Sequence, residues 1–292
     1  MAGDCLDIDK DRARFYSSLL SRAFFERLIK DGNDTKLLDR INRLDSSGTC
    51  VNMSICNYLR IAYNYLAKNY RNEYVYKNAL IRKLIHAYSS RNSVIFSEFK
   101  VGRSYADLVM FNGESRVYEI KTELDTSSRL ASQLNDYKGF FQKIYIVTHS
   151  DYADKYAAMD ESVGLIALSY HAGSIQLRTI REPIKNNHAD ASTIMKTLHT
   201  SEYKKLVMKL YGALPPVGSF QMYNACLNIL RMEEGSLLQE EANKIIKERK
   251  SVTRYLRRYE RGTSHLMQIC LSLHIQPNEY ENLRTILKQV IA

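Results

Sequence analysis

Two short apolar segments of the chain carry charged residues whose types and spacing suit phosphodiester chemistry. Asp107 interrupts the apolar run 106–111, and Glu119 and Lys121 lie on either side of Ile120 in the run 117–121. Carboxylates supply the oxygen ligands that Mg²⁺ prefers, and an ammonium group can stabilise the charge that develops on a phosphate during hydrolysis. The residues therefore predict a metal-dependent site for phosphodiester cleavage.

A tight turn is expected to bring these segments together. The pair Asn112-Gly113 lies between the two apolar runs, and Asn-Gly between apolar segments is a strong signal for a β-hairpin. Side chains alternate between the faces of a strand, so Glu119 and Lys121 should share one face while Ile120 is buried on the other. The hairpin would then place Asp107 beside them.

The arrangement resembles the PD-(D/E)XK nuclease superfamily, in which an acid on one strand is followed by Glu-x-Lys on the next. Asp107 and Glu119-Ile120-Lys121 match that signature, and Ala106 stands where a proline is often found. The resemblance implies that Asp107 and Glu119 bind Mg²⁺ or Mn²⁺, with the carbonyl of Ile120 as a further ligand. It also implies that Lys121 acts on the attacking water and stabilises the transition state.

A second motif narrows the resemblance to part of the superfamily. Gln133 and Tyr137 have the Gln-x-x-x-Tyr spacing found after the lysine motif in the RecB-like and lambda-exonuclease-like branches. A helix is expected over residues 127–141, and a spacing of four places both side chains on one of its faces. The resemblance gives them a role in the catalytic site, holding the Glu119-Lys121 strand or a DNA phosphate. The alternative is that they are ordinary helix surface and core.

A further acid would complete the metal site, and the sequence offers two candidates. Glu73 begins an expected helix over residues 73–88, where superfamily members commonly carry such an acid. Glu98, in the expected strand 94–99, competes with it for this role. Glu73 could instead form an ordinary helical ion pair with Lys77, four positions later.

Structural explanations compete with the catalytic ones. Glu119 and Lys121 could form a solvated cross-strand charge pair, because charged residues normally lie outside. Asp107 is harder to explain in this way, because a carboxylate within an apolar strand is costly unless it is paired or binds a metal. Arg103 and Tyr105 precede Asp107 and could face DNA or simply continue the strand.

The order of the expected elements predicts an α/β fold with a restriction-endonuclease-like mixed sheet flanked by helices. Three regions are expected, namely an N-terminal helical region over 1–70, a nuclease-like core over 71–182 and a C-terminal helical region over 190–292. The two helical regions are expected to pack together. Additional strands are expected at 143–148, 163–169 and 174–179, and additional helices at 10–30, from about 35 to 46, at 55–70 and at 152–159.

The charge of the chain favours a polyanionic partner. Its 292 residues carry a formal net charge of +10, which attracts nucleic acids but says nothing about the fold. Apolar runs are too short to span a bilayer and the start of the chain is acidic, so a cytoplasmic protein is expected. Five widely spaced cysteines predict reduced thiols rather than disulfides or a zinc site. A glycine-rich phosphate loop is absent, so no ATPase motor is expected.

The densest positive segment, residues 244–261, predicts a cationic helix able to bind phosphates. It contains Arg254, Arg257 and Arg258 around Tyr255 and Tyr259. The segment that ends in Gly262 also has a short similarity to repressor-type helix-turn-helix domains. A solvated helix face remains the plain alternative.

These observations predict a metal-dependent deoxyribonuclease that requires Mg²⁺ or Mn²⁺ and acts on DNA. The resemblance associates such domains with phages, mobile elements and defence systems. Endonuclease and exonuclease action both remain open, although Gln-x-x-x-Tyr favours the latter. One alternative is a catalytically inactive nucleic-acid-binding protein that retains the fold. Another is an interaction module that docks other proteins of a larger system.

Overall fold

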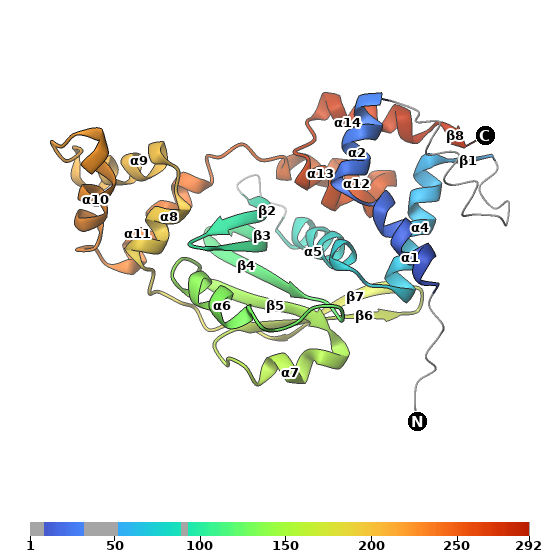
Figure 1. The fold of residues 1–292 in the computed structure, drawn as a ribbon, viewed down its shortest axis with the longest axis horizontal. Coiled ribbons are helices and arrows are strands. Elements are labelled where there is room, and N and C mark those ends of the chain that lie inside the picture. The colour runs from blue at the N-terminus through green and yellow to red at the C-terminus, as the bar shows by residue number, and fades with distance from the viewer. Residues whose placement is uncertain (1–8, 32–51, 89–92, 292) are drawn as a thin grey trace. The chain divides into compact units, whose positions relative to one another are not determined.

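The computed structural model describes residues 9–31, 52–88 and 93–291 (Figure 1). Contacts between Cα atoms divide the chain into two compact units, each with a hydrophobic core of its own. The first unit comprises residues 1–87, 169–177 and 252–292, and the second comprises residues 88–168 and 178–251. Neither unit is one continuous stretch of the sequence.

A six-stranded mixed sheet, in the order β2-β3-β4-β5-β6-β7, organises the second unit. Its strands are β2 (Val94–Val101), β3 (Ser104–Asn112), β4 (Glu114–Lys121), β5 (Lys143–His149), β6 (Gly164–His171) and β7 (Ser174–Arg181). Strands β2, β3 and β4 are antiparallel, whereas β4, β5 and β6 are parallel. The turn between β6 and β7 and the adjoining ends of both strands group with the first unit. The expected α/β class, with a mixed sheet flanked by helices, is confirmed.

Local sequence explains the connections in this sheet. Asn112 pairs with Glu114 across Gly113, whose φ of +71° glycine adopts without steric cost, so the expected hairpin is present. Parallel strands cannot be joined by a tight turn, and helix α6 (Leu130–Lys138) provides the crossover from β4 to β5. Almost every residue of β5 is buried, as is typical of a parallel strand that is covered on both faces.

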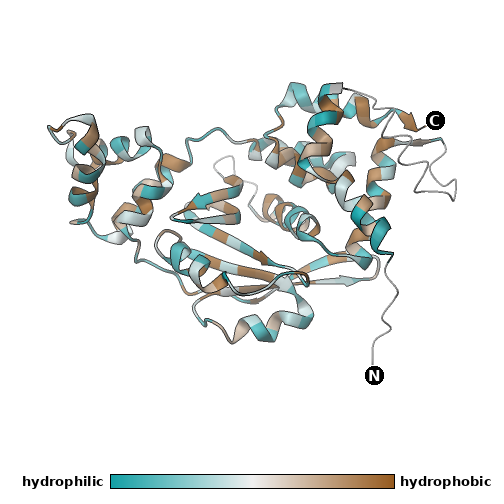
Figure 2. Ribbon diagram, in the orientation of Figure 1, coloured by the Kyte–Doolittle hydropathy of each residue, from teal (hydrophilic) through white to brown (hydrophobic). Residues whose placement is uncertain are grey.

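Helices complete the core of the second unit. Besides α6 they are η1 (Ser150–Tyr152), α7 (Ala153–Ala157), α8 (Ala191–Thr197), α9 (Thr200–Tyr211), α10 (Ser219–Leu230) and α11 (Gly235–Ile246). Their apolar faces share one hydrophobic cluster with the sheet, and the rings of Phe99, Phe111, Phe140 and Phe141 contact one another within it. Figure 2 shows hydrophobic residues along the central strands and alternating hydrophobic and hydrophilic residues on the helices.

Helices from both ends of the chain form the first unit. They are α1 (Lys10–Leu19), α2 (Arg22–Asp31), α4 (Ile55–Asn69), α5 (Glu73–Ala87), α12 (Thr253–Thr263), η2 (Ser264–Leu266), α13 (Met267–Ser272) and α14 (Pro277–Leu287). One hydrophobic cluster includes Tyr58 near the N-terminus and Leu283 near the C-terminus. In addition, β1 (Met53–Ser54) pairs with β8 (Val290–Ile291).

These two units differ from the three consecutive regions expected from the sequence. Helix α5, expected to open the nuclease-like core, groups with the first unit, and helices α8 to α11 share the core of the sheet. Of the expected helices, the one at 55–70 is present as α4, whereas the helix over 10–30 is interrupted between α1 and α2. The break predicted at Ser46 and the helix before it lie outside the described residues.

The single cationic helix expected over 244–261 is wrong. Helix α11 ends at Ile246 and α12 begins at Thr253. The segment between them tightens into turns and then runs through Ser251 and Val252, which are weak helix formers. The side chain of Arg249 forms a bidentate ion pair with Glu202, so its charge is no longer part of a continuous cationic face. Within the described ranges, no helix has both the length and the apolar composition needed to cross a bilayer.

Candidate functional site

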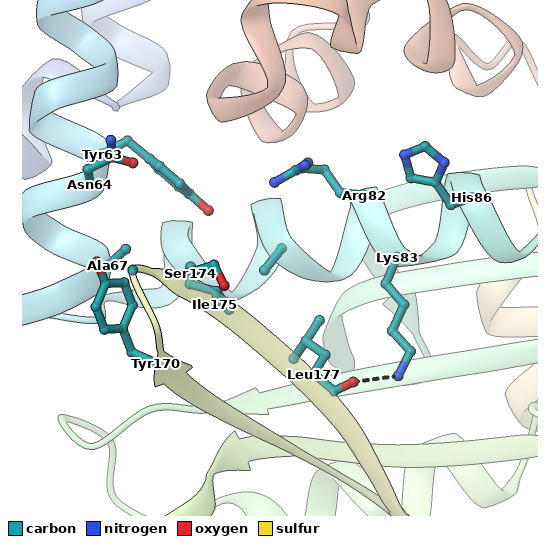
Figure 3. Close-up of a pocket in the computed structure, with 12 residues that line it drawn as sticks. Tyr63, Asn64, Ala67, Arg82, Lys83, His86, Tyr170, Ser174, Ile175 and Leu177 are labelled. Carbon is teal, nitrogen blue, oxygen red and sulfur yellow. Dashed lines mark hydrogen bonds between the residues drawn. The ribbon is translucent and has the colours of Figure 1, made fainter.

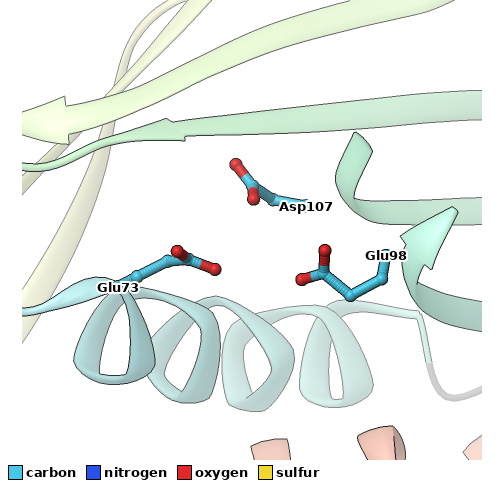
Figure 4. A group of neighbouring side chains, drawn as sticks. All are labelled: Glu73, Glu98 and Asp107. Carbon is cyan, nitrogen blue, oxygen red and sulfur yellow. The ribbon is translucent and has the colours of Figure 1, made fainter. Parts of the chain in front are cut away.

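Two carboxylates oppose each other on adjacent strands of the second unit. The pairs Ser97 with Leu108 and Phe99 with Ala106 fix the register of β2 and β3, which places Glu98 directly across from Asp107. Carboxylate oxygens of these two acids lie within 4.8 Å of each other (Figure 4). Like charges directly opposite each other destabilise a strand pair. A divalent cation between them would remove that repulsion, because its hard charge suits oxygen ligands.

The backbone of Glu98 is strained at this position. Its φ is +52°, although the residue is not glycine and lies inside a strand. Such a conformation costs on the order of 1–3 kcal/mol and persists where the surrounding structure enforces it, often at functional sites. Phe96 and Phe99, on either side, are buried in the core and hold this part of β2 in place. Glu98 itself is exposed and Asp107 is partly buried.

Asp107 also joins β3 to β4. Its Oδ2 atom accepts a hydrogen bond of 2.7 Å from the backbone N–H of Ile120. Backbone pairing of β3 with β4 extends from the hairpin turn as far as Leu108 and Tyr118. Asp107 is the next residue of β3 beyond the last of these pairs. The carboxylate therefore satisfies a backbone group just beyond the end of the ladder and is held against the strand that carries Glu119.

Glu119 and Lys121 form a buried charge pair on one face of β4. Their side chains are joined by a hydrogen bond of 2.7 Å between Nζ and Oε1, and the two residues are only 2% and 8% exposed. The solvated pair considered as an alternative is therefore wrong. Buried charges are costly unless further hydrogen bonds satisfy them, and such bonds come from helix α6.

Gln133 and Tyr137 supply these bonds from one face of α6. The Oε1 atom of Gln133 accepts from Lys121 Nζ at 3.1 Å, and the hydroxyl of Tyr137 donates to Glu119 Oε2 at 2.6 Å. The contact expected between this helix and the Glu119-Lys121 strand is thus present. Burial raises the pKa of Tyr137, and the negative charge of Glu119, with a smaller effect from Asp107, raises it further. The phenol therefore stays protonated and continues to donate.

Ile120 and Glu73 are the two remaining residues that the sequence predicted as metal ligands. The side chain of Ile120 is buried, and its N–H is the group bound by Asp107. The role of its carbonyl as a metal ligand stays a prediction. Glu73 is the first residue of α5, in the first unit, and forms the ion pair with Lys77 that was considered as its alternative. Its role as a ligand also stays a prediction.

Two further residues near the site are Asp136, which had little signal in the sequence, and Tyr105, which the sequence offered as a residue that could face DNA. Asp136 accepts hydrogen bonds from Ser104 Oγ at 2.6 Å and from the Arg103 N–H at 3.1 Å, so it ties the β2–β3 turn to α6. Its position within the Gln133 to Tyr137 segment was the only hint. Tyr105 lies two positions before Asp107 on the same strand face and is 59% exposed. Its ring is available to contact a ligand beside the acids.

This arrangement combines two functions in neighbouring parts of the sheet. Glu98 and Asp107 present oxygen atoms suited to Mg²⁺ or Mn²⁺. Glu119 and Lys121 provide a fixed carboxylate and ammonium group, whose orientation is set by Gln133 and Tyr137. Such a combination of hard oxygen donors and a positioned cation suits the stabilisation of a negatively charged phosphate.

Comparisons with known proteins assign the chain to a family. The profile of the family described as Bacteriophage P4 protein cII matches residues 66–284, well over half of the chain. Protein cII of Enterobacteria phage P4 is 26% identical over 157 residues, which cover 53% of this chain and 58% of that relative. Among solved structures, a protein of unknown function from Silicibacter pomeroyi is 15% identical, with a TM-score of 0.32 over 50% of this chain and 94% of that one. The extent of the profile match shows that the chain belongs to the bacteriophage P4 protein cII family.

Proposed function

We propose that the protein is a metal-dependent nuclease that hydrolyses phosphodiester bonds of DNA. The observation that carries the proposal is the opposed pair of carboxylates, Glu98 and Asp107, in the same unit as the buried Glu119-Lys121 pair. A strained backbone and adjacent like charges are both unfavourable for folding alone. Their presence in one strand pair supports a functional site.

The carboxylates of Asp107, Glu98 and Glu119 would hold Mg²⁺ or Mn²⁺, together with the Ile120 carbonyl. Glu73 is a further ligand by the resemblance to PD-(D/E)XK nucleases, and substitution by Gln tests it separately. When bound, the metal supplies a water of lowered pKa and a positive charge for the phosphate oxygens. The oxygen-rich donor set fits these ions, which bind carboxylates, carbonyls and water in preference to nitrogen or sulfur.

Lys121 is the residue proposed to act on the reacting groups. Its ammonium is oriented by Glu119 and Gln133, so little side-chain entropy remains to be lost when a phosphate is engaged. In this position it can orient the attacking water and offset the negative charge that develops on the phosphate. Tyr137 keeps the Glu119 carboxylate in place as a positioning residue.

A second candidate is a nucleic-acid-binding protein that retains this fold without hydrolysis. One observation favours it, because both oxygens of Glu119 accept hydrogen bonds, from Lys121 and from Tyr137. A carboxylate satisfied in this way can serve a purely structural role. The two candidates differ in whether DNA is cut.

DNA is the proposed substrate because the net charge of +10 favours a polyanion. A phage context is supported by the relative from phage P4. We propose a cytoplasmic site of action, where such DNA would be met, and interaction with other proteins of a larger system. The cleavage products distinguish the two modes of action, because an endonuclease cuts circular DNA and an exonuclease needs a strand end.

Incubation of the pure protein with linear, circular and single-stranded DNA tests the proposal. Cleavage is expected with Mg²⁺ or Mn²⁺ and not with EDTA, and Asp107→Asn should abolish it. Asp154→Asn is a matched control, because Asp154 is an exposed acid on α7 of the same unit. DNA that is bound but never cut under any of these conditions would favour the second candidate, whereas equal cleavage by both variants would exclude the assigned site.

A further inference from the structure

A pocket in the first unit is built from three elements, namely α4, α5 and the hairpin that joins β6 to β7. Its volume is about 500 Å³, and its walls include Tyr63 of α4, Arg82 and Lys83 of α5, and Tyr170 of β6 (Figure 3). Such a volume lies within the range of small-ligand sites, about 300–1,000 Å³. All of the residues that line it belong to the first unit.

One face of α5 makes the pocket positive. Ala79, Arg82, Lys83 and His86 line it, and their spacing of three and four places them on one side of the helix. The small side chain of Ala79 leaves space, while the other three side chains bring basic groups to the wall. Among the described residues that line the pocket, none is acidic.

The basic groups are held in place by contacts at their edges. Glu260 accepts from Nε of Arg82 at 2.8 Å and pairs with Nε2 of His86 at 2.7 Å. Lys83 donates from Nζ to the backbone carbonyl of Leu177 at 3.0 Å. Glu260 thus contacts Arg82 and His86, whereas Lys83 and Arg82 both bring a permanent positive charge to the wall.

The rest of the wall offers flat and apolar surface. The partly exposed ring of Tyr170 and the edge of the largely buried Tyr63 contribute aromatic surface, and Ile175 and Leu177 contribute aliphatic groups. Figure 3 shows the hydroxyl end of Tyr63 directed toward the side chain of Arg82, so the aromatic and basic parts converge on the same space. Aromatic rings stack on nucleic-acid bases, and arginine and lysine bind phosphates.

We infer that this pocket binds a nucleotide, with its phosphate on Arg82 and Lys83 and its base against the tyrosine and aliphatic wall. The ligand that this pocket would recognise has one phosphate and one planar base, joined through a sugar. Two sources can supply it, a free mononucleotide or the terminal nucleotide of a DNA strand. The inference goes beyond the proposed nuclease, because it uses none of the residues assigned to hydrolysis.

Isothermal titration calorimetry of the full chain in EDTA tests this inference without cleavage. The probes are 2′-deoxyadenosine 5′-monophosphate, 2′-deoxyadenosine, inorganic phosphate and a short oligothymidylate with a 5′-phosphate. We expect saturable binding of the mononucleotide, at least tenfold tighter than that of either fragment. The oligonucleotide identifies the source, since binding by it alone points to a strand end and binding of both points to a free nucleotide.

Two variants locate the binding. Lys83→Ala removes one charge, and Arg82→Gln removes the other while keeping a donor for Glu260. Each should weaken binding at least tenfold, whereas Lys68→Ala, which removes an exposed charge from α4, should leave it unchanged. Circular dichroism checks the fold, and if Arg82→Gln unfolds, Lys83→Ala decides alone. Failure of both the mononucleotide and the oligonucleotide to bind, or equal binding by Lys83→Ala and wild type, would overturn the inference and leave the proposed nuclease untouched.

Discussion

At the scale of single residues, the acids of β2 and β3 are the centre of the proposed metal site. Glu98 and Asp107 place like charges across a strand pair, and Glu98 does so with a φ of +52°. The sequence was sufficient to select Asp107, Glu119 and Lys121 as candidates, because each carries charge into an apolar run. It left Glu98 as one of two competing acids, because neither its left-handed backbone nor its partner across the sheet has a local sequence signal.

Metal binding gives the first prediction. The double variant Asp107→Asn, Glu119→Gln loses two proposed carboxylate ligands, so its affinity for Mn²⁺ should fall by about tenfold or more. Calorimetry measures this directly, with Asp154→Asn as the control that loses an acid elsewhere in the same unit. Equal affinity in the double variant and the wild type would show that the ion binds elsewhere.

Glu98 gives a second prediction, in which stability and metal binding change in opposite directions. Glu98→Asn removes the charge repulsion, and Asn tolerates the left-handed region better than Glu. In the absence of metal we expect the free energy of unfolding of the second unit to rise by about 1 kcal/mol, while Mn²⁺ affinity falls.

Urea unfolding in EDTA measures the stability of this variant. Glu240→Gln is the control, because Glu240 is exposed on α11 of the same unit. A variant that is less stable than wild type, or that binds Mn²⁺ normally, would remove Glu98 from the site.

At the scale of elements, α12 carries an arginine stripe, defined as Arg254, Arg257, Arg258 and Arg261. All four are exposed, and their spacing places the first three on one face of the helical part, while Leu256 and Tyr259 are buried on the other. Arg261 and Gly262 leave the helical conformation. The sequence predicted the charge of this segment from composition alone. It did not predict the break before Thr253, where Arg249 pairs with Glu202, a partner distant in the sequence.

DNA binding by the arginine stripe is the third prediction. Changing Arg254, Arg257 and Arg258 to Ala should weaken binding and flatten its salt dependence by roughly one unit of slope per lost phosphate contact. Sequence preference should not change, because phosphate contacts carry no base information. Fluorescence anisotropy at several salt concentrations measures both quantities.

Arg14→Ala provides the comparison for the stripe, since Arg14 is a highly exposed arginine of α1 in the same unit. If the triple variant keeps the affinity and the salt slope of wild type, α12 is a solvated face and DNA binds elsewhere.

The hairpin and the helices show how far local patterns reach. Asn112-Gly113 predicted the turn because the dipeptide itself favours the required backbone, and the Gln133 and Tyr137 spacing predicted a shared helix face. The interruption between α1 and α2 was not predicted, because the apolar spacing continues across it. Local signals of this kind identify an element better than they identify its ends.

At the scale of the whole molecule, each unit combines segments that are far apart in the sequence. Residues 252–292 share a core with residues of α1, α2 and α4, and 178–251 share one with the sheet. The expected boundaries followed the order of the sequence because composition changes near residue 183. Long-range packing, such as the pairing of Met53 with Ile291, has no local signature and decides the division instead.

The buried His265 of the first unit gives the fourth prediction. Burial, with a contribution from the charge of Arg60, lowers the pKa of this imidazole to about 3, whereas in the unfolded chain it is about 6.5. Between these pH values the unfolded state binds one more proton than the folded state. Stability should therefore be unaffected by His265 above about pH 6.5 and fall below it, with a slope of up to about 1.4 kcal/mol per pH unit.

Chemical denaturation from pH 7 to pH 4 measures that slope, and His265→Leu should reduce it by removing the proton-binding group. His274→Gln is the control, because His274 is exposed in the same unit. An equally steep loss of stability in His265→Leu and wild type would assign the acid sensitivity to other groups.

The proposed hydrolysis is tested most directly at Lys121, which is buried, fixed by Glu119 and Gln133, and outside the proposed set of metal ligands. The decisive measurement is single-turnover cleavage of DNA in Mg²⁺ by wild type, Lys121→Ala and Lys121→Arg. We expect Lys121→Ala to lose about a hundredfold or more in rate while Mn²⁺ and DNA binding survive, as for the loss of a positioned charge in a transition state. Arginine should restore little, because it lacks the compact amine. Cleavage that persists undiminished in Lys121→Ala would contradict the assigned site and the mechanism proposed for it.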